Sequence, residues 1–265
     1  MNMPTRRAVL ILGGTSEGYA LAEALAGRDD LRVISSLAGR TPNPRLPAGE
    51  RRVGGFGGVA GLTGFLHTEH IAAVIDATHP FAAAMGRHAA EACGSLGIPL
   101  LRLERPPWRP EPGDRWLPVR DWPGAVDTLR GLDAHRVLLA LGRQELAPFA
   151  VLGDVRFVIR CVSPPDPLPP FTAAELLLDR GPFDLDAERA LLDRHGIDCI
   201  VCKNSGGSAS AAKLTAARER GIPVVMRERP PRPGLASAPD VPAALAWLER
   251  LVGISSRDGC QSGPR

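Results

Sequence analysis

A short glycine-containing segment near the start of the sequence has the residue types that bind phosphate. It consists of Gly13, Gly14, Thr15, Ser16 and Glu17. An apolar run at residues 8–12 precedes it and a helical pattern at residues 17–26 follows it. A helix N-terminus attracts anions, and glycine lets the backbone approach a pyrophosphate closely. The segment therefore predicts a dinucleotide site. A plain strand-to-helix turn is the alternative, because the spacing is GGxxxG rather than GxGxxG.

The end of the next predicted strand, at residues 31–36, indicates which dinucleotide would fit. A site for NAD usually has Asp or Glu here, whose carboxylate binds the ribose 2′-OH. This sequence instead has Ser36, Gly39, Arg40 and Thr41. Hydroxyl and guanidinium donors suit a 2′-phosphate, which a carboxylate would repel. We therefore expect the cofactor to be NADPH, with a solvated loop as the alternative.

A glycine loop and a histidine loop follow later strands of the same half. Residues 53–58 hold four glycines around one phenylalanine, which is typical of a loop lying flat against a ligand or of a flexible turn. Residues 73–83 contain Asp76, Thr78 and His79 at the end of a strand, where open α/β sheets bind ligands. We assign Thr78 to the cofactor site and His79 to the reaction centre. The alternative is that both only cap the next helix, with Pro80 in its first turn.

A second glycine turn ends a predicted strand in the other half of the chain. It comprises Lys203, Asn204, Ser205, Gly206 and Gly207, and Lys213 lies on the helix predicted after it. Further cations that could lie at the same edge are Arg180, Arg227, Arg229 and Arg232. A lysine and glycine N–H groups at a helix N-terminus would form an anion-binding cradle for the substrate. The alternatives are a helix start capped by Asn204 or Ser205 and, around Arg180, a plain surface turn.

The composition indicates an anionic small molecule as the partner. The chain has 265 residues, a formal net charge of +3 and 32 basic residues, of which only Lys203 and Lys213 are lysine. Arginine suits the bidentate recognition of carboxylate and phosphate. The net charge is too small for general attraction to nucleic acid or membranes, and an aromatic content of 5% argues against a stacking platform for single strands.

The cysteines indicate neither a metal site nor a redox pair. Five are scattered along the chain, and Cys199 and Cys202 lie in a strand-like run. Residues three apart on a strand point to opposite faces, so we expect buried thiols and no bound metal. A secretory signal and a run of about 18 apolar residues are both lacking from the sequence, which predicts a cytoplasmic protein.

Alternation of short apolar runs with helical patterns predicts an α/β fold built from parallel sheets. We expect an NADP-binding domain at residues 1–110, a second, substrate-binding α/β domain at 111–253, and a tail without order at 254–265. Proline-rich residues 105–113 would connect the domains. Strands are predicted at 8–12, 31–36, 52–53, 71–76, 99–103, 137–141, 155–161, 174–178, 199–203 and 223–226. Helices are predicted at 17–26, 62–69, 82–96, 123–129, 186–195, 209–220 and 242–252.

The motifs together resemble the precorrin-6A reductase family of corrin (vitamin B12) biosynthesis. The matching strings are LILGGTSE at residues 10–17, DATHPFA at 76–82, RGPF at 180–183 and KNSGG at 203–207. They occur in the order of the family, and the resemblance covers about residues 8 to 250. The second and fourth strings are specific, whereas the opening glycine turn is not.

The resemblance implies two Rossmann-like domains with the active site in the cleft between them. It also implies NADPH-dependent reduction of precorrin-6A, a tetrapyrrole with several acetate and propionate groups, to precorrin-6B. Contacts with neighbouring enzymes of the pathway would be transient. The sequence does not separate this substrate from the cobalt-containing one of the anaerobic route. Two rivals outside the family are a non-catalytic NADP-sensing module and a two-domain sugar-binding protein.

Overall fold

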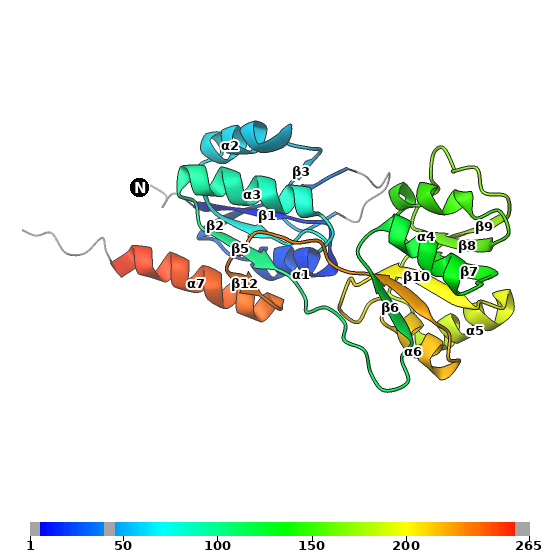
Figure 1. Ribbon diagram of the computed structural model, residues 1–265. Helices are drawn as coiled ribbons and strands as arrows, with labels where there is room; N and C mark the ends of the chain where they lie inside the picture. Colours follow the sequence, from blue (N-terminus) through cyan, green and yellow to red (C-terminus); the bar gives the residue numbers. More distant parts are fainter. Residues whose placement is uncertain (1–5, 40–45, 258–265) are drawn as a thin grey trace, which may run out of the picture. The chain divides into compact units, whose positions relative to one another are not determined.

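The computed structural model describes residues 6–39 and 46–257, and it consists of two compact units (Figure 1). Unit 1 comprises the chain up to Arg105 and again from Pro231 onward, and unit 2 comprises Pro106–Pro230. The chain therefore leaves unit 1, forms the whole of unit 2 and then returns to complete unit 1.

Unit 1 is built around a six-stranded parallel sheet. Its strands are β1 (Arg7–Leu12), β2 (Leu31–Leu37), β3 (Glu50–Val53), β4 (Ile71–Asp76), β5 (Leu100–Leu103) and β12 (Ser237–Ala238). Its helices are α1 (Ser16–Leu25), α2 (Gly58–Thr68), α3 (Ala83–Leu96) and α7 (Val241–Arg257). The strand order β3-β2-β1-β4-β5-β12 is that of a Rossmann fold. The order reverses between β1 and β4, and ligands bind beside such a switch point.

Alternating side chains of β1 pack against helices on both faces of this sheet. Val9 and Ile11 pack with Leu21 of α1 and Leu248 of α7, whereas Leu10 packs on the opposite face. Figure 1 shows α1 and α7 on one face and α2 and α3 on the other. Strands apolar on both sides are what a parallel sheet between two helical layers requires.

Unit 2 contains a second six-stranded parallel sheet. Its strands are β6 (Trp116–Val119), β7 (Arg136–Ala140), β8 (Arg156–Cys161), β9 (Ala174–Leu178), β10 (Cys199–Lys203) and β11 (Val224–Arg227). The helices are α4 (Trp122–Gly131), α5 (Leu185–His195) and α6 (Ala212–Glu219), with the short 3₁₀ helices η1 (Arg143–Glu145) and η2 (Ala147–Val151). The order β9-β8-β7-β10-β11-β6 again reverses at its centre, between β7 and β10.

The two sheets differ in the origin of their sixth strand. In unit 1 it is β12, which follows all of unit 2 in the chain and pairs with β5 through Ser237 and Ala238. In unit 2 it is β6, which opens the unit and pairs with β11. Only the sheet of unit 1 is therefore completed by a strand that is separated in the chain from the other five.

The predicted α/β class and parallel sheets are confirmed, and the second domain boundary needs correction. Residues 231–253 belong to unit 1 rather than to a domain at 111–253, because β12 pairs with β5 and α7 packs on α1. The predicted tail is helical as far as Arg257, and residues 258–265 lie outside the described residues. Strands β6 and β12 were missing from the predicted set, since β6 has only four residues and contains Pro118, and β12 has only two.

Candidate functional site

The turn between β1 and α1 has the geometry of a phosphate cradle. Gly14 has φ +120, a conformation that L side chains rarely adopt. A Cβ on Gly18 would lie 3.3 Å from the Cβ of Ala77, so a glycine permits the close approach of α1 to the end of β4. The N–H groups of residues 14–17 donate to no other residue within the described ranges. The residues present therefore fit a diphosphate at the start of α1.

Two of the predicted contacts in this turn have internal roles. The Thr15 hydroxyl is the N-cap of α1: it accepts from the Gly18 N–H at 3.2 Å and donates to the Ala77 carbonyl at 2.8 Å. The Glu17 carboxylate accepts from the Arg105 guanidinium at 2.6 Å. That ion pair offsets a negative charge that would otherwise repel a phosphate at this helix end. Thr15 and Glu17 can therefore serve an anion through their backbone N–H groups rather than their side chains.

At the ends of β2 and β3, the predicted residue Ser36 lies beside Arg52. The sequence analysis had not assigned Arg52 to the site. Arg52 donates to the carbonyls of Gly54 and Gly55, both at 2.6 Å, and its Nη1 lies 3.4 Å from Ser36 Oγ. Its guanidinium carbon lies 3.9 Å from the centre of the Phe56 ring. Arg52 forms no ion pair within the part of the chain that the structure describes. The result is an uncompensated cation beside Ser36.

The other predicted residues of this edge are only partly described. Gly39 has φ +72, and a Cβ there would lie 3.1 Å from Val53 Cγ1. Arg40 and Thr41 lie outside the described residues, so their assignment to the cofactor stays a prediction.

The glycine loop at residues 54–58 is held on helix α2 by Phe56. A Cβ on Gly61 of α2 would lie 1.7 Å from the Phe56 carbonyl oxygen, so the loop lies directly on the helix. The Phe56 and Phe65 rings meet edge to face with centroids 5.2 Å apart. Together with the Arg52 hydrogen bonds to Gly54 and Gly55, these contacts hold the loop at both its start and Phe56.

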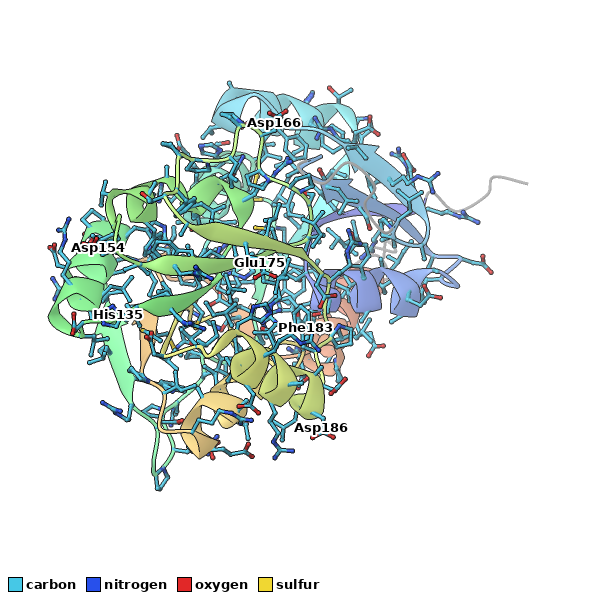
Figure 2. The ribbon with its side chains drawn as sticks, turned by 90° about the vertical axis from the view of Figure 1, so that its right-hand side faces the viewer. His135, Asp154, Asp166, Glu175, Phe183 and Asp186 are labelled. Carbon is cyan, nitrogen blue, oxygen red and sulfur yellow. The ribbon has the colours of Figure 1, made fainter. Side chains whose placement is uncertain are left out.

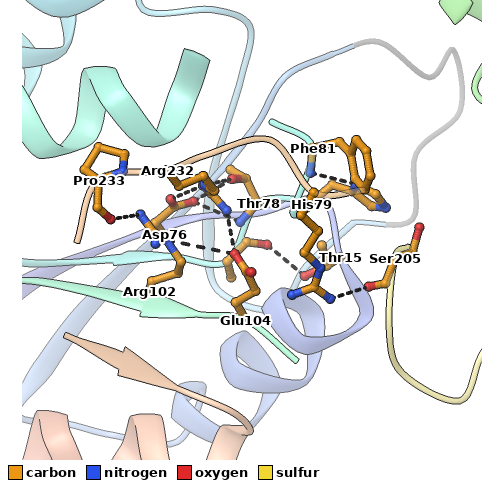
Figure 3. Close-up of polar contacts among 12 residues, drawn as sticks. Thr15, Asp76, Thr78, His79, Phe81, Arg102, Glu104, Ser205, Arg232 and Pro233 are labelled. Carbon is orange, nitrogen blue, oxygen red and sulfur yellow. Dashed lines mark hydrogen bonds and ion pairs between the residues drawn. The ribbon is translucent and has the colours of Figure 1, made fainter. Parts of the chain in front are cut away.

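The loop after β4 is organised by a fully buried carboxylate (Figure 3). Asp76 has 0% exposure, and its Oδ1 accepts from the Thr78 N–H at 3.1 Å and from the Thr78 hydroxyl at 2.6 Å. Its Oδ2 accepts from Arg232 at 2.6 Å. The Thr78 side chain is thus used inside the unit, so we assign it to holding this loop rather than to contacting the cofactor. Arg232 lies in unit 1 and not on the second cradle, which corrects its predicted placement.

His79 stands at the carboxyl end of β4 in a defined orientation. Its Nδ1 accepts from the Phe81 N–H at 3.2 Å, which places the proton of a neutral imidazole on Nε2. The Ala82 N–H donates to the His79 carbonyl at 2.7 Å, closing a turn that contains Pro80. Helix α3 begins only at Ala83, so Pro80 lies before the helix and not in its first turn as predicted.

In unit 2, the loop after β10 is held from behind by Trp108 and Arg229. The Asn204 side chain accepts from the Trp108 N–H at 2.8 Å and donates to the Trp108 carbonyl at 3.1 Å. The Trp108 indole donates to the Gly207 carbonyl at 2.8 Å. Arg229 donates to the carbonyls of Asn204 and Ser205 at 3.0 and 3.1 Å. Asn204 and Arg229, both predicted to bind substrate, therefore brace the loop.

The glycines of this loop keep it from being the first turn of a helix. Gly206 and Gly207 have φ +69 and +74, and a Cβ on Gly206 would lie 2.1 Å from the Pro106 carbonyl oxygen. Helix α6 begins at Ala212 and not at the predicted residue 209, since residues 209–211 form a turn. The N–H groups of Gly207 and Ser208 donate to no other residue that the structure describes. With the carbonyls turned toward Trp108 and Arg229, these N–H groups are the donors of the loop that an anion could use.

Lys203 is held by an acid from the neighbouring loop. Its Nζ lies 2.5 Å from Glu145 Oε2, and Arg227 lies 3.3 Å from Glu145 Oε1. Two cations thus share the Glu145 carboxylate. Lys203 remains at the predicted edge, and Glu145 is a partner that the sequence analysis missed.

Lys213 is a buried scaffold residue rather than part of the open edge. It has 3% exposure, its Nζ donates to the Ser210 carbonyl at 2.5 Å, and it lies 4.7 Å from the Trp108 ring centre. Burial lowers the pKa of Lys213 and raises the pKa of the neighbouring Cys202 thiol. The predicted role of Lys213 in binding substrate directly does not match this environment. Cys199 and Cys202 are both buried, and burial raises the pKa of the Cys199 thiol to about 12, as expected for structural thiols.

The segment from Arg180 to Phe183 lies against the loop that follows β10. The Phe183 N–H donates to the Ala209 carbonyl at 3.2 Å, and a Cβ on Gly181 would lie 3.2 Å from the same oxygen. Figure 2 shows Phe183 on the segment that leads into α5. The Arg180 side chain is exposed and forms no ion pair among the described residues. Arg180 is therefore a cation that an anionic ligand could reach.

Within residues 6–39 and 46–257, no group of three His, Cys, Asp or Glu side chains is arranged to hold a metal ion. No described helix combines the length and the apolar character needed to span a membrane.

Comparison with known proteins gives consistent matches over most of the chain. Residues 8–249 match the family model described as precorrin-6x reductase CbiJ/CobK. The precorrin-6A reductase of Rhodococcus erythropolis is 48% identical over 92% of this chain and 98% of its own length. A solved structure of a CobK precorrin-6A reductase superimposes with a TM-score of 0.87, at 40% identity, covering 92% of this chain and 97% of the other. The cobalt-precorrin-6A reductase of Priestia megaterium is more distant, at 28% identity over 84% of this chain and 90% of its own length.

Proposed function

Because the chain belongs to the precorrin-6x reductase CbiJ/CobK family and is therefore an oxidoreductase of cobalamin biosynthesis, we propose that it reduces precorrin-6A to precorrin-6B with NADPH. In this proposal the glycine turn of unit 1 binds the dinucleotide. The carboxyl edge of unit 2 binds acetate and propionate groups of the tetrapyrrole.

The choice of NADPH over NADH rests on the uncompensated cation beside Ser36. Arg52 is fixed by two carbonyls and the Phe56 ring, and its guanidinium carries no carboxylate partner within the described ranges. An Asp or Glu, which would select the ribose 2′-OH of NAD, is lacking at the end of β2, where Ser35 and Ser36 stand. A guanidinium and a hydroxyl together are the donors that a 2′-phosphate accepts from.

The residues of unit 1 bind and orient the cofactor and provide a proton donor. When bound, NADPH supplies a hydride that reduces a carbon of the conjugated macrocycle. The N–H groups of Gly14 to Glu17 hold the diphosphate at the N-terminus of α1. Electron density that reaches the ring must be offset by a proton, and the Nε2–H of His79 is the donor that we assign to this role. The Phe81 N–H fixes the imidazole in the tautomer that can donate from Nε2.

The residues of unit 2 bind the carboxylates of the substrate. Gly207 and Ser208 offer backbone N–H groups, Arg180 offers an exposed guanidinium, and Lys203 adds charge from a pair with Glu145. Preorganised donors of this kind bind anions without a reorganisation cost, because Trp108 and Arg229 already fix the loop.

The metal-free substrate is the better candidate of the two that the family offers. The relatives named precorrin-6A reductase are 41% to 48% identical to this chain, whereas those named cobalt-precorrin-6A reductase are 26% to 28% identical. The difference in identity favours precorrin-6A without cobalt, and the proposal is made for that substrate.

The experiment compares two cofactors and two arginine variants. Arg52→Ala should weaken NADPH binding about 10- to 100-fold, the effect of losing one to two charge-assisted contacts, and should leave NADH binding unchanged. Dissociation constants from calorimetry and the rate of NADPH oxidation with precorrin-6A and with cobalt-precorrin-6A measure both parts of the proposal. Arg40→Ala should show the same selectivity if Arg40 is a second contact.

Arg51→Ala is the matched control, because Arg51 is an exposed neighbour on the same strand. It should bind both cofactors like the wild type. Equal weakening of NADPH and NADH by Arg52→Ala would mean that Arg52 only supports the glycine loop. Faster oxidation of NADH than of NADPH, or reduction of the cobalt substrate alone, would refute the corresponding part of the proposal.

A further inference from the structure

Arg232 reaches unit 1 on the segment that returns from unit 2, and it ends in a buried position (Figure 3). Its side chain is 5% exposed. Nη2 donates to Asp76 Oδ2 at 2.6 Å and lies 3.3 Å from Thr78 Oγ1, and Nη1 donates to Glu104 Oε2 at 2.8 Å. One guanidinium therefore joins the loop after β4 to the strand end after β5.

Helix α3 has a glycine, Gly86, at the position that faces this guanidinium. A Cβ on Gly86 would lie 2.4 Å from Arg232 Nη2 and 2.9 Å from its Nε. A Cβ at residue 86 would force the guanidinium to shift, so glycine leaves the room in which Arg232 reaches Asp76 and Glu104. Glycine costs about 1 kcal/mol relative to alanine inside a helix, so its presence here needs a local reason, and the space for Arg232 supplies one.

The charges around Arg232 compensate one another in a largely buried site. Asp76 is fully buried, and a buried carboxylate without a cation is strongly unfavourable. Glu104 also lies 3.9 Å from Arg102, which donates to the Pro233 carbonyl at 3.0 Å beside Arg232. Burial, and next the charge of Arg232, lower the pKa of Arg102. Two carboxylates and two guanidiniums thus form a neutral set that depends on Arg232.

This set is connected to the proposed phosphate cradle through a single residue. Ala77 follows Asp76, its carbonyl accepts from the Thr15 hydroxyl, and its Cβ lies at the contact that Gly18 permits. Thr15 in turn caps α1. A shift of the Asp76–Thr78 loop would therefore move the cap of the helix whose N–H groups hold the diphosphate.

We propose that Arg232 is a positioning residue for the cofactor site of unit 1, acting through Asp76 and Ala77 on the start of α1. The inference rests on the proposed NADPH site and goes beyond it. In this inference the segment that returns from unit 2 supports cofactor binding through Arg232. Arg232 itself is buried and need not touch the dinucleotide.

The experiment measures NADPH affinity of folded protein in three variants. Arg232→Gln removes the charge, and Gly86→Ala keeps Arg232 but fills the space of its guanidinium. Each should raise the Kd for NADPH about 10-fold or more, since displacements of an ångström in a supporting residue have effects of this size. Gly94→Ala is the matched control on the same helix, because a Cβ on Gly94 would meet nothing within 4 Å. It should bind NADPH like the wild type.

Calorimetric titration with NADPH is done well below the Tm of each variant, so that loss of stability alone does not alter the Kd. Should Arg232→Gln fail to fold, Gly86→Ala carries the test. Wild-type affinity in folded Gly86→Ala, or an equal loss in Gly94→Ala, would overturn the role of Arg232. A wild-type protein that binds no NADPH would instead overturn the proposed function, and the inference with it.

Discussion

The two units share one strand order but differ at the two central strands that flank the switch point. The strand that leads into the glycine turn in one unit corresponds to the strand that leads to an acid in the other. In unit 1 the loop after the first central strand, β1, is the glycine turn, and the second central strand, β4, ends at the acid Asp76. In unit 2 the loop after β7 carries the acid Glu145, and the loop after β10 carries Gly206 and Gly207. Each acid is paired with an arginine or lysine of its own unit.

The helix after the first central strand differs as well. In unit 1, α1 is ten residues long and has Thr15 as its N-cap, so its first N–H groups could donate to a phosphate. In unit 2 the corresponding position holds the three-residue 3₁₀ helix η1, in which Glu145 is the last residue. A short helix that ends in a carboxylate is a poor site for a phosphate. The shared topology provides two edges, and the loop residues determine which anion each edge can bind.

The largest predicted effect is that of a substitution at His79, in the loop after β4. His79→Asn should lower kcat about 100-fold or more, because asparagine can still accept from the Phe81 N–H but cannot supply a proton. The NADPH Kd should change little. His67→Asn is the control, since His67 is exposed in the last turn of α2. An unchanged kcat with the same pH dependence would leave His79 as a residue that shapes the turn before α3.

The sequence predicted those parts of the site that depend on local chain geometry. Gly13 and Gly14 could be recognised because a strand, a glycine turn and a helix follow one another within a few residues. The strands β4 and β10 were equally visible as apolar runs that end in polar residues. Local patterns of this kind are read from one stretch of sequence, and so the α/β class and most element positions agree with the structure.

The contacts that the sequence did not reveal join residues far apart in the chain. Arg232 meets Asp76 across 156 positions, and Trp108 meets Asn204 across 96. Nothing near Arg232 indicates that it is buried, because its reason is a glycine on α3 and a carboxylate at the end of β4. Arg52 could have been noticed, since it stands directly before the glycine loop that accepts its hydrogen bonds.

Alanine variants of Gly14 and Gly142 test whether the loop after β1 or the loop after β7 binds the dinucleotide. Gly14→Ala should weaken NADPH binding about 10- to 100-fold, because a side chain at φ +120 is strained by an amount on the order of 1–3 kcal/mol. Gly142→Ala, after β7, should leave the NADPH Kd unchanged, since Gly142 has φ −72 and a Cβ there would lie 3.4 Å from Glu145. Calorimetric titration with NADPH measures both. A greater loss in Gly142→Ala would place the dinucleotide in unit 2.

The smallest predicted effect concerns Lys203 and its partner Glu145. Lys203→Met should raise the KM for the tetrapyrrole about 10-fold, the scale of one lost charge-assisted contact, and leave the NADPH Kd unchanged. Glu145→Gln separates two roles of the lysine, because it removes the charged partner that lies 2.5 Å from Nζ and keeps the lysine. If Lys203 contacts substrate carboxylates, Glu145→Gln should keep or lower the KM. A parallel rise of KM in both variants would mean that Lys203 acts only by holding Glu145, and a loss of NADPH binding in Lys203→Met would show that the two glycine loops bind the opposite ligands.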